Sequence, residues 1–180
     1  YRRDRSSAEY RSVYEKADPL VTICIATYNR ARLLSERSLQ SAMAQSYSNI
    51  EIIVVGDACT DETVEVMTEI KDPRVRFANL EQRGDYPTDP RLRWMVAGTA
   101  PLNRALSMAR GDFITHLDDD DEHSPDRVAQ LLACIRDTRA DLVYHPFEYE
   151  TAEGQWMVNS AASLQKNRVT TSSIFYHNWF

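Results

Sequence analysis

The sequence predicts an α/β protein with a doubly wound, mostly parallel β-sheet flanked by helices. Short apolar runs rich in β-branched residues alternate four times with segments whose apolar residues recur at helical spacing. The runs are apolar throughout, which is typical of strands that a parallel sheet buries on both faces. The chain has 180 residues, enough for one such domain and a short appendage.

The start of the chain is expected to form that appendage. Apolar side chains at helical spacing predict a short amphipathic helix over residues 6–17, and Asp18-Pro19 ends it. We therefore expect an N-terminal helical extension over residues 1–18 and one domain over residues 19–180.

Three strands and two helices are expected in the first half of the domain. The strands are the apolar runs at 20–26, 50–55 and 75–80, and the helices lie between them at 31–45 and 61–71. The positions expected to face the sheet are Leu33, Leu34, Leu39 and Met43 in the first helix and Val64, Met67 and Ile70 in the second.

The second half begins with a long segment, residues 81–97, that contains prolines and three arginines. We interpret it as a loop, and long loops in compact domains are usually functional or mobile. A helix follows at 100–110, which Gly111 closes, and then a strand at 112–117. A short apolar run predicts a fifth strand at 142–144.

Local capping and turn signals refine these boundaries. Thr60 is a candidate cap for the second helix. Ser124-Pro125-Asp126 combines a cap, a proline and an acid, which predicts a helix start. Tyr149 and Trp156 flank Glu153-Gly154, which predicts a hairpin.

The overall charge excludes one class of partner. The chain has 21 basic and 27 acidic residues, a net charge of 21 − 27 = −6. Non-specific binding to nucleic acid needs clustered Lys and Arg, so we expect no nucleic acid partner. No apolar stretch approaches the 18 residues of a membrane-spanning helix.

Glycine and cysteine spacing excludes several motifs. No two of the five glycines are closer than 13 residues, so neither the G-x-G-x-x-G fingerprint nor a P-loop is present. The three cysteines form no C-x-x-C pair, which gives a zinc ribbon or redox motif no support. We interpret Cys24 and Cys134 as small core residues, which fits a reducing compartment.

Four consecutive aspartates are the most informative feature of the sequence. Asp118, Asp119, Asp120 and Asp121 directly follow the strand at 112–117. Adjacent carboxylates raise each other's pKa unless a cation compensates, and Mg²⁺ or Mn²⁺ suits such oxygen ligands. A solvated acidic turn before a helix is the alternative, and the four residues alone leave both interpretations open.

Three polar segments follow strands, at 27–30, 57–61 and 118–121. Ligands of doubly wound sheets bind at the carboxyl ends of the strands, so these segments are expected to meet at one edge. Asp57, which ends the second strand, is a candidate acceptor for a base N–H or a sugar hydroxyl. A turn or capping role is the alternative.

Other charged residues are weaker candidates. Arg83, Arg91 and Arg93 have the geometry to clamp a diphosphate, although each is also an ordinary loop charge. His116 is expected to be buried and hydrogen-bonded. Glu148 and Glu150, near the predicted hairpin, are candidate bases.

Several segments occur together in one order over about residues 20–145. They are 21–30, 44–55, 56–61, Asn103 with Ala105, 109–114, the acidic cluster and Pro125-Asp126. Taken together they resemble the family 2 glycosyltransferases, which have a GT-A fold with a Rossmann-like sheet. The individual pieces are short, whereas their combination is specific.

The resemblance implies a nucleotide pocket at the first two polar segments. Ala26, Thr27 and Tyr28 would line it. Asp57 matches the second acid of the family's usual Asp-Asp pair, which receives the uracil edge in uridine-using members. Gly56 stands where the family has the first acid, and this departure bears on which base is preferred.

The resemblance also implies roles at the acidic cluster. Asp118 or Asp119 would meet the ribose or the donor sugar, and Asp120 would bind the metal that bridges the diphosphate. Arg91 or Arg93 would be the loop cation.

The implied reaction is transfer of a sugar from a nucleotide diphosphate sugar, a UDP-sugar, to a saccharide or lipid-linked acceptor. Transfer would invert the anomeric carbon with help from Mn²⁺ or Mg²⁺. The base of such enzymes lies in a C-terminal part that we expect beyond Phe180, together with the acceptor site. The family's usual context is cell-envelope polysaccharide synthesis in the cytoplasm, peripheral to the inner face of the membrane, in chains that can carry other domains.

Two other functions compete with this one. A nucleotidylyltransferase would need a glycine-rich loop after the first strand, which residues 26–30 do not provide. A non-catalytic nucleotide-sugar-binding or scaffold domain fits the lack of a convincing base, whereas the acidic cluster argues against it.

Overall fold

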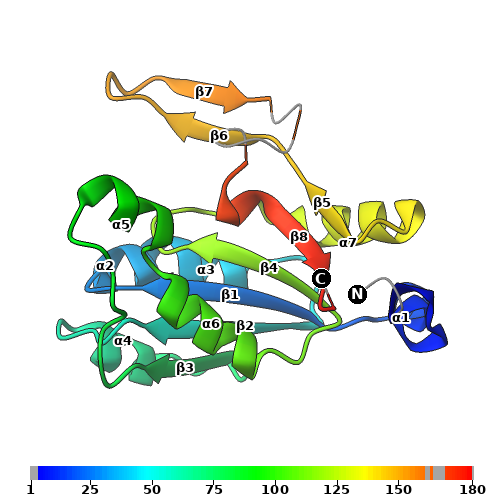
Figure 1. Cartoon of the computed structure of the whole chain (residues 1–180), viewed down its shortest axis with the longest axis horizontal. Coiled ribbons are helices and arrows are strands. Elements are labelled where there is room, and N and C mark those ends of the chain that lie inside the picture. The colour runs from blue at the N-terminus through cyan, green and yellow to red at the C-terminus, as the bar shows by residue number, and fades with distance from the viewer. Residues whose placement is uncertain (1–3, 161–162, 164–168, 180) are drawn as a thin grey trace.

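The computed structural model of the chain describes residues 4–160, 163 and 169–179. In this part of the chain a six-stranded sheet carries helices on both faces, which confirms the predicted α/β fold (Figure 1). The strands of the sheet are β1 (Val21–Thr27), β2 (Ile50–Gly56), β3 (Val75–Asn79), β4 (Phe113–Asp118), β5 (Leu142–Tyr144) and β8 (Ile174–His177).

The sheet is parallel except for β8. The strand order is β3-β2-β1-β4-β8-β5, and β8 runs antiparallel to both of its neighbours. Ala26 of β1 lies opposite Val55 of β2 and Asp118 of β4. The carboxyl ends of these three strands therefore share one edge of the sheet.

The central strands are buried on both faces. All of β2 is buried, and in β1 every residue but the half-buried Ala26 is buried. Glu51 is a polar exception in β2. Its carboxylate accepts hydrogen bonds from Thr22 Oγ1 at 2.7 Å and Arg110 N at 2.6 Å, which offsets the cost of its burial.

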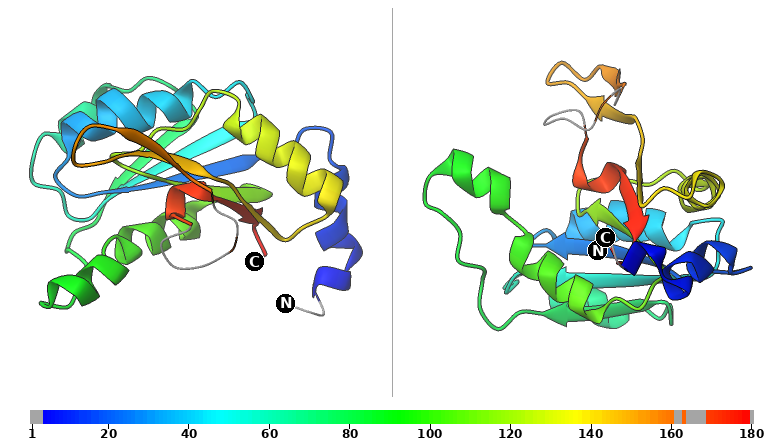
Figure 2. Two further views of the ribbon diagram at one scale, coloured as in Figure 1. Left: turned by 90° about the horizontal axis from the view of Figure 1, so that it is seen from above. Right: turned by 45° about the vertical axis from the view of Figure 1, so that its right-hand side comes forward.

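Helices cover the two faces of the sheet unequally (Figure 2). On one face α6 packs against β1 and β2, with Ala105 in the same apolar cluster as Cys24 and Ile53. The other face is covered by the helices between residues 31 and 43, by α4 and by α7. The helices are α1 (Ala8–Ser12), α2 (Ala31–Leu33), the π-helical turn η3 (Leu34–Ser38), α3 (Leu39–Met43), α4 (Thr63–Glu69), α5 (Pro90–Val96), α6 (Thr99–Met108) and α7 (Arg127–Thr138).

The helix predicted at 31–45 is present as α2, η3 and α3 in succession. Its buried face includes Ala31, Leu34, Ser38 and Ala42. The prediction that Leu33 faces the sheet is wrong. Its side chain lies outside the buried face of these helices and is 37% exposed.

Two further predicted core positions are exposed. Val64 lies on the outer side of α4, where Thr63 and Met67 are the buried residues. Cys134 is exposed on α7, whereas Cys24 is buried as predicted. The buried residues of α7 are Arg127, Val128, Leu131, Leu132 and Ile135, which leaves position 134 on the solvent side.

Both predicted helix starts lie before the observed ones. Thr60 does not cap α4, because the N-cap residue is Glu62, which makes no side-chain cap hydrogen bond. The carboxylate of Asp61 accepts the N–H of Thr63, the first residue of the helix, at 3.2 Å. α7 begins three residues after Ser124, whose carbonyl accepts the N–H of Arg127 at 3.0 Å. A turn therefore separates the predicted start from the helix.

The interpretation of residues 81–97 as a loop is wrong in its second half, because α5 lies there. The carboxylate of Asp89 accepts the N–H groups of Arg91 and Leu92, and Pro90 occupies the first turn. This is a capped, proline-led helix start. None of the residues of α5 is buried, so it lacks the apolar periodicity that reveals a packed helix.

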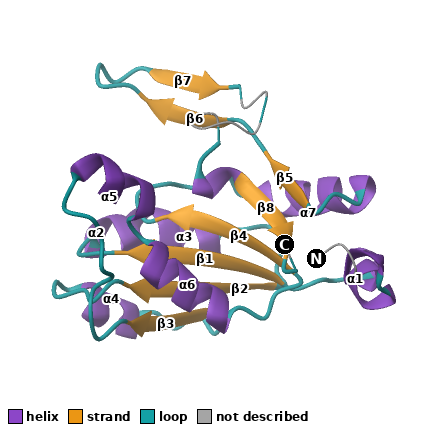
Figure 3. Ribbon diagram, in the orientation of Figure 1, coloured by secondary structure: helices purple, strands orange, loops and turns teal. Residues whose placement is uncertain are grey.

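The C-terminal part contains the predicted fifth strand and the predicted hairpin. The hairpin consists of β6 (Phe147–Glu150) and β7 (Trp156–Asn159), and it stands away from the main sheet (Figure 3). The strand β8 is absent from the sequence prediction. It lies between β4 and β5 and pairs with both.

The N-terminal segment packs on the last strand. The predicted helix at 6–17 is present as α1 and a 3-10 turn, η2 (Val13–Glu15), and residues 1–3 of the expected extension lie outside the described residues. Tyr10 is buried, and its ring stacks on that of His177 at 3.9 Å. Among the helices of the described residues, none has the length and hydropathy to cross a membrane.

Candidate functional site

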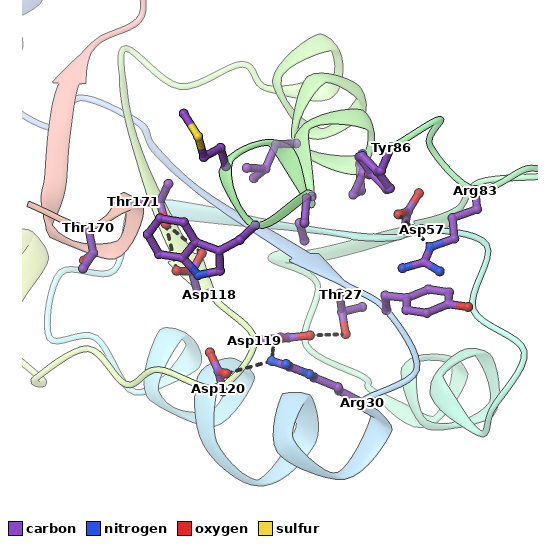
Figure 4. A pocket seen from close by; sticks show the side chains of 18 of the residues that line it. Thr27, Arg30, Asp57, Arg83, Tyr86, Asp118, Asp119, Asp120, Thr170 and Thr171 are labelled. Atoms are coloured by element: carbon purple, nitrogen blue, oxygen red, sulfur yellow. Dashed lines mark hydrogen bonds and ion pairs between the residues drawn. The ribbon is translucent and has the colours of Figure 1, made fainter. Parts of the chain in front are cut away.

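A pocket of about 770 Å³ lies at the carboxyl edge of the sheet (Figure 4). Its volume is in the range of small-molecule sites. The turns after β1, β2 and β4 form its polar floor. The lining residues are Ala26, Thr27, Tyr28, Arg30, Asp57, Arg83, Tyr86, Trp94, Met95, Ala97, Gly98, Pro101, Leu102, Asp118, Asp119, Asp120, Phe147, Val169, Thr170 and Thr171.

One end of the pocket is formed around Asp57. This side chain is only 2% exposed, and its carboxylate accepts the N–H of Gly84 at 2.9 Å. Its other oxygen lies 3.7 Å from Arg83 Nε. The guanidinium of Arg83 lies over the ring of Tyr28, 3.6 Å from its centroid. A buried acceptor beside a flat aromatic and a planar cation suits a planar ligand with a polar N–H edge.

The turn that carries Asp57 is tied to the turn after β1. The N–H of Asp57 donates to the carbonyl of Thr27 at 2.8 Å, and Cys59 Sγ donates to the same carbonyl. Asn29 and Ala58 both adopt left-handed backbone with φ near 50°, at 51° and 56°. These two turns hold the pocket floor in a conformation that costs Ala58 free energy, because an alanine side chain disfavours it.

We expect Ala58→Gly to stabilise the protein by about 1 kcal/mol, because glycine adopts a positive φ at no steric cost. The melting temperature should rise by roughly 2–4 °C. The matched control is Ala105→Gly, at a buried position inside α6, which should destabilise by about 1 kcal/mol or more. Thermal unfolding of both variants checks the prediction, and a lower melting temperature for Ala58→Gly contradicts it.

The other end of the pocket is the acidic edge, which we define as Asp118, Asp119 and Asp120. Both oxygens of Asp118 lie 2.8 Å from Thr171 Oγ1, which donates to them. Asp119 accepts Thr27 Oγ1 at 2.8 Å and Arg30 Nη1 at 2.9 Å. The same nitrogen of Arg30 donates to Asp120 at 2.7 Å.

Burial and the neighbouring carboxylates disfavour the charged forms of Asp118 and Asp119. Burial, with help from the charges of Asp121, Asp120 and Asp119, raises the pKa of Asp118 to about 6, although the hydrogen bond from Thr171 opposes the shift. Burial also raises the pKa of Asp119. A cation at this edge is therefore favoured.

The donor set at the acidic edge fits a divalent cation shared with a ligand. Asp120 is half-exposed, with 48% of its side chain accessible. No three His, Cys, Asp or Glu side chains within the described part of the chain are grouped to hold a metal ion, so a closed protein cage is not formed there. Mg²⁺ or Mn²⁺ needs only one or two carboxylates when phosphate oxygens and water supply the remaining positions.

The three arginines singled out in the sequence separate in the structure. Arg83 lines the pocket, whereas Arg91 and Arg93 belong to α5 and do not. Arg93 Nε donates to the carbonyl of Pro87 at 2.9 Å. The candidate bases of β6 are exposed and also lie outside the set of lining residues.

Several lining residues were not singled out by the sequence analysis, although two of them belong to segments that it placed at the site. Arg30 is the last residue of the polar segment 27–30, and Trp94 belongs to α5 within the segment 81–97. Thr171 lies in a 3-10 turn, η4 (Thr171–Ser173), just before β8, a part of the chain that the sequence analysis did not connect with the site. Arg30 could have been singled out from the sequence, because it ends the polar run Tyr28-Asn29-Arg30 directly after the first strand. Nothing local marks Thr171, because only the pairing of β8 brings it to Asp118.

A buried guanidinium lies behind the acidic edge. Arg127 is 5% exposed and, among the described residues, has no carboxylate partner. It donates to His145 Nε2 at 2.8 Å, Thr115 Oγ1 at 3.0 Å and the carbonyl of Ser172 at 2.7 Å. This residue therefore ties η4 and β8 to α7.

The nearby histidines are buried and neutral. His116 is hydrogen-bonded to Tyr176 Oη at 2.8 Å, as the sequence predicts. Burial, and then the charge of Arg127, lowers the pKa of His116 to about 4. The same two causes, in the same order, lower the pKa of His123 well below 6.5. Protonating either residue places a second positive charge beside a buried one.

Stability is therefore expected to fall by about 2 kcal/mol between pH 7 and pH 5. Folding lowers the pKa of both histidines, so their contribution is complete above pH 6.5 and is lost as the pH falls toward 4. Asp118 and Asp119, whose pKa values are raised, act in the opposite direction. The lowered pKa values of His145 and His177 add to the loss, and the histidines together outweigh the two carboxyls. Urea unfolding at the two pH values measures the change, and His123→Gln should show less of it. Equal stability at both pH values would contradict the prediction.

Comparison with known proteins gives one family. The sequence profile described as Glycosyl transferase family 2 matches residues 22–87 and 93–178. The succinoglycan biosynthesis protein ExoO of Rhizobium meliloti is 35% identical over 114 residues, which cover 63% of this chain and 29% of that protein. This chain spans between 15% and 50% of the length of the curated relatives compared.

Solved structures share the fold. Residues 1–349 of S. aureus TarS in complex with UDP-GlcNAc give a TM-score of 0.67 at 19% identity, covering 88% of this chain and 45% of that one. The mannosyltransferase PcManGT from Pyrobaculum calidifontis, in complex with GDP-Man and Mn²⁺, gives 0.56 at 24% identity, covering 76% and 37%.

Proposed function

The chain belongs to glycosyl transferase family 2, a family of nucleotide-sugar glycosyltransferases, and we propose that it transfers the sugar of a UDP-sugar to a saccharide or lipid-linked acceptor, with inversion and with a divalent cation. One observation carries the proposal. A single pocket joins a buried acceptor, Asp57, to the acidic edge. These are the features that a planar base and a diphosphate require at opposite ends of one ligand.

The Asp57 end would bind the nucleotide. Asp57 would accept the N–H of the base, with Tyr28 and Arg83 against the ring, and Ala26 and Thr27 would line the pocket beside them. TarS, solved with UDP and with UDP-GlcNAc, supports a uridine donor. PcManGT was solved with GDP-Man, so a guanosine nucleotide is the alternative donor to compare with uridine.

The acidic edge would bind the diphosphate and the sugar. Asp120 would hold the cation, which supplies charge stabilisation as the β-phosphate leaves. Asp118 and Asp119 would accept hydrogen bonds from hydroxyl groups of the ribose or the donor sugar. The structure of PcManGT with Mn²⁺ supports a divalent cation in this fold.

Inversion also requires a base for the acceptor hydroxyl. Glu148 and Glu150 are exposed and do not line the pocket, so we do not propose either. The name of ExoO, a succinoglycan biosynthesis protein, supports a saccharide acceptor. We propose that the reaction takes place on the cytoplasmic side, peripheral to the membrane, where lipid-linked acceptors are presented.

Calorimetric titration of UDP, with and without Mn²⁺, tests the proposal. We expect Mn²⁺ to strengthen UDP binding about tenfold in the wild type and to have no effect in Asp120→Asn. Asp121→Asn removes an equal charge from the next residue and should behave as the wild type. GDP and dTDP test the choice of base. Failure of the folded protein to bind any of these nucleotides would overturn the proposal and favour a scaffold role.

A further inference from the structure

The acidic edge already contains a cation of the chain's own, the guanidinium of Arg30. A single nitrogen, Nη1, donates to Asp119 Oδ1 at 2.9 Å and to Asp120 Oδ2 at 2.7 Å. Figure 4 shows this side chain reaching the two carboxylates from the floor of the pocket. Arg30 therefore neutralises the carboxylate that we propose as the metal ligand.

The partners of the acidic edge differ in how easily they can be exchanged. Asp118 is bound on both oxygens by Thr171, and the buried Asp119 is also held by Thr27. Arg30 and Asp120 are each 48% exposed at their side chains. The contact between Arg30 and Asp120 is thus the one that can open without disturbing the core.

A divalent cation on Asp120 and the guanidinium of Arg30 are incompatible neighbours. Both are positive and both seek the same carboxylate, so each weakens the binding of the other. Arg30 also lines the pocket, and its five N–H donors suit phosphate oxygens. When a divalent cation occupies Asp120, the diphosphate of a bound donor is an anion that the Arg30 side chain can reach instead.

We propose that Arg30 has two positions. In the donor-free protein it pairs with Asp119 and Asp120, and when a divalent cation occupies Asp120 it turns to the phosphates of the donor. The proposal rests on the proposed function and adds a donor-binding residue to it. It also implies that the cation binds well only together with the nucleotide.

Replacing Arg30 with glutamine should change two affinities in opposite directions. Mn²⁺ binding without nucleotide should become about fivefold tighter, because a competing cation is removed. UDP binding at saturating Mn²⁺ should become about tenfold weaker, because a charged hydrogen bond to phosphate is lost. Uridine, which has no phosphate, should bind as it does to the wild type. A merely structural role would weaken all three.

Titrations of Mn²⁺, UDP and uridine into the wild type, Arg30→Gln and Arg32→Gln measure these affinities. Arg32 pairs with Glu36 on the surface, so its substitution removes the same charge without touching the acidic edge, and its affinities should stay within about twofold of wild type. Mn²⁺-dependent UDP binding with no gain in Mn²⁺ affinity for Arg30→Gln overturns this inference alone. Absence of Mn²⁺ binding in every protein, with and without UDP, overturns it together with the proposed metal.

Discussion

Arg127→Ala is expected to lower the free energy of unfolding by about 3 kcal/mol. The substitution removes the donor to the carbonyl of Ser172 and to His145 Nε2, and it leaves a cavity between α7 and η4. Removal of the buried charge offsets part of this loss of stability, because no carboxylate among the described residues pairs with Arg127 and its burial is unfavourable. Urea unfolding measures the difference.

The matched control is Arg136→Ala on the same helix. Arg136 Nε donates to the carbonyl of Tyr14 at 3.1 Å, and its side chain is only half-buried. We expect a loss of about 1 kcal/mol or less for this variant. If both substitutions cost the same, Arg127 is an ordinary helix residue and does not tie the C-terminal segment to the sheet.

Asp57→Asn is expected to weaken UDP binding roughly 10- to 100-fold. The amide has the size of the carboxylate and can still accept the N–H of Gly84 through its oxygen. Its NH₂ group then lies where the base would present its own N–H, so two donors meet. The loss of the charge also frees Arg83 from its partner. Calorimetry with UDP measures the effect.

Two comparisons separate this contact from a general loss of charge. Asp85→Asn alters an exposed carboxylate one residue beyond Gly84 and should leave UDP affinity within about twofold of wild type. Inorganic pyrophosphate with Mn²⁺ should bind equally well to Asp57→Asn and to the wild type. A loss of pyrophosphate binding in that variant would show that Asp57 does not act on the base.

Much of the sheet is predictable because its central strands are continuous apolar runs. β1 and β2 are buried on both faces, and parallel strands of this kind leave a strong local signal. The local sequence signal of α5 and of β8 is weaker. α5 buries nothing, so no apolar periodicity marks it, although Asp89-Pro90 was available as a start signal. β8 is defined by its pairing with β4 and β5, which are far away in the sequence.

The candidate site likewise contains residues that the sequence predicts and residues that it does not. Asp57 and the acidic edge follow strands directly, so their meeting at one edge can be predicted from the order of the elements. The structure brings Arg83, rather than Arg91 or Arg93, to the pocket, because α5 carries the latter two elsewhere. Arg30 belongs to the polar segment 27–30, so its position near the acidic edge follows from the same order of elements. Thr171 reaches Asp118 only because β8 pairs with β4, and sequence spacing contains no information about that contact.

The position of β8 has a consequence for how the protein is made. Phe113 of β4 pairs with His177, which is synthesised 64 residues later (177 − 113). At about 5–20 residues per second, a ribosome needs roughly 3–13 s to supply that partner. During this time β4 has one open edge, which is a site for pairing with other chains. We therefore expect newly made chains to be most prone to aggregation at this stage, and slow translation of residues 114–177 should increase the need for chaperones.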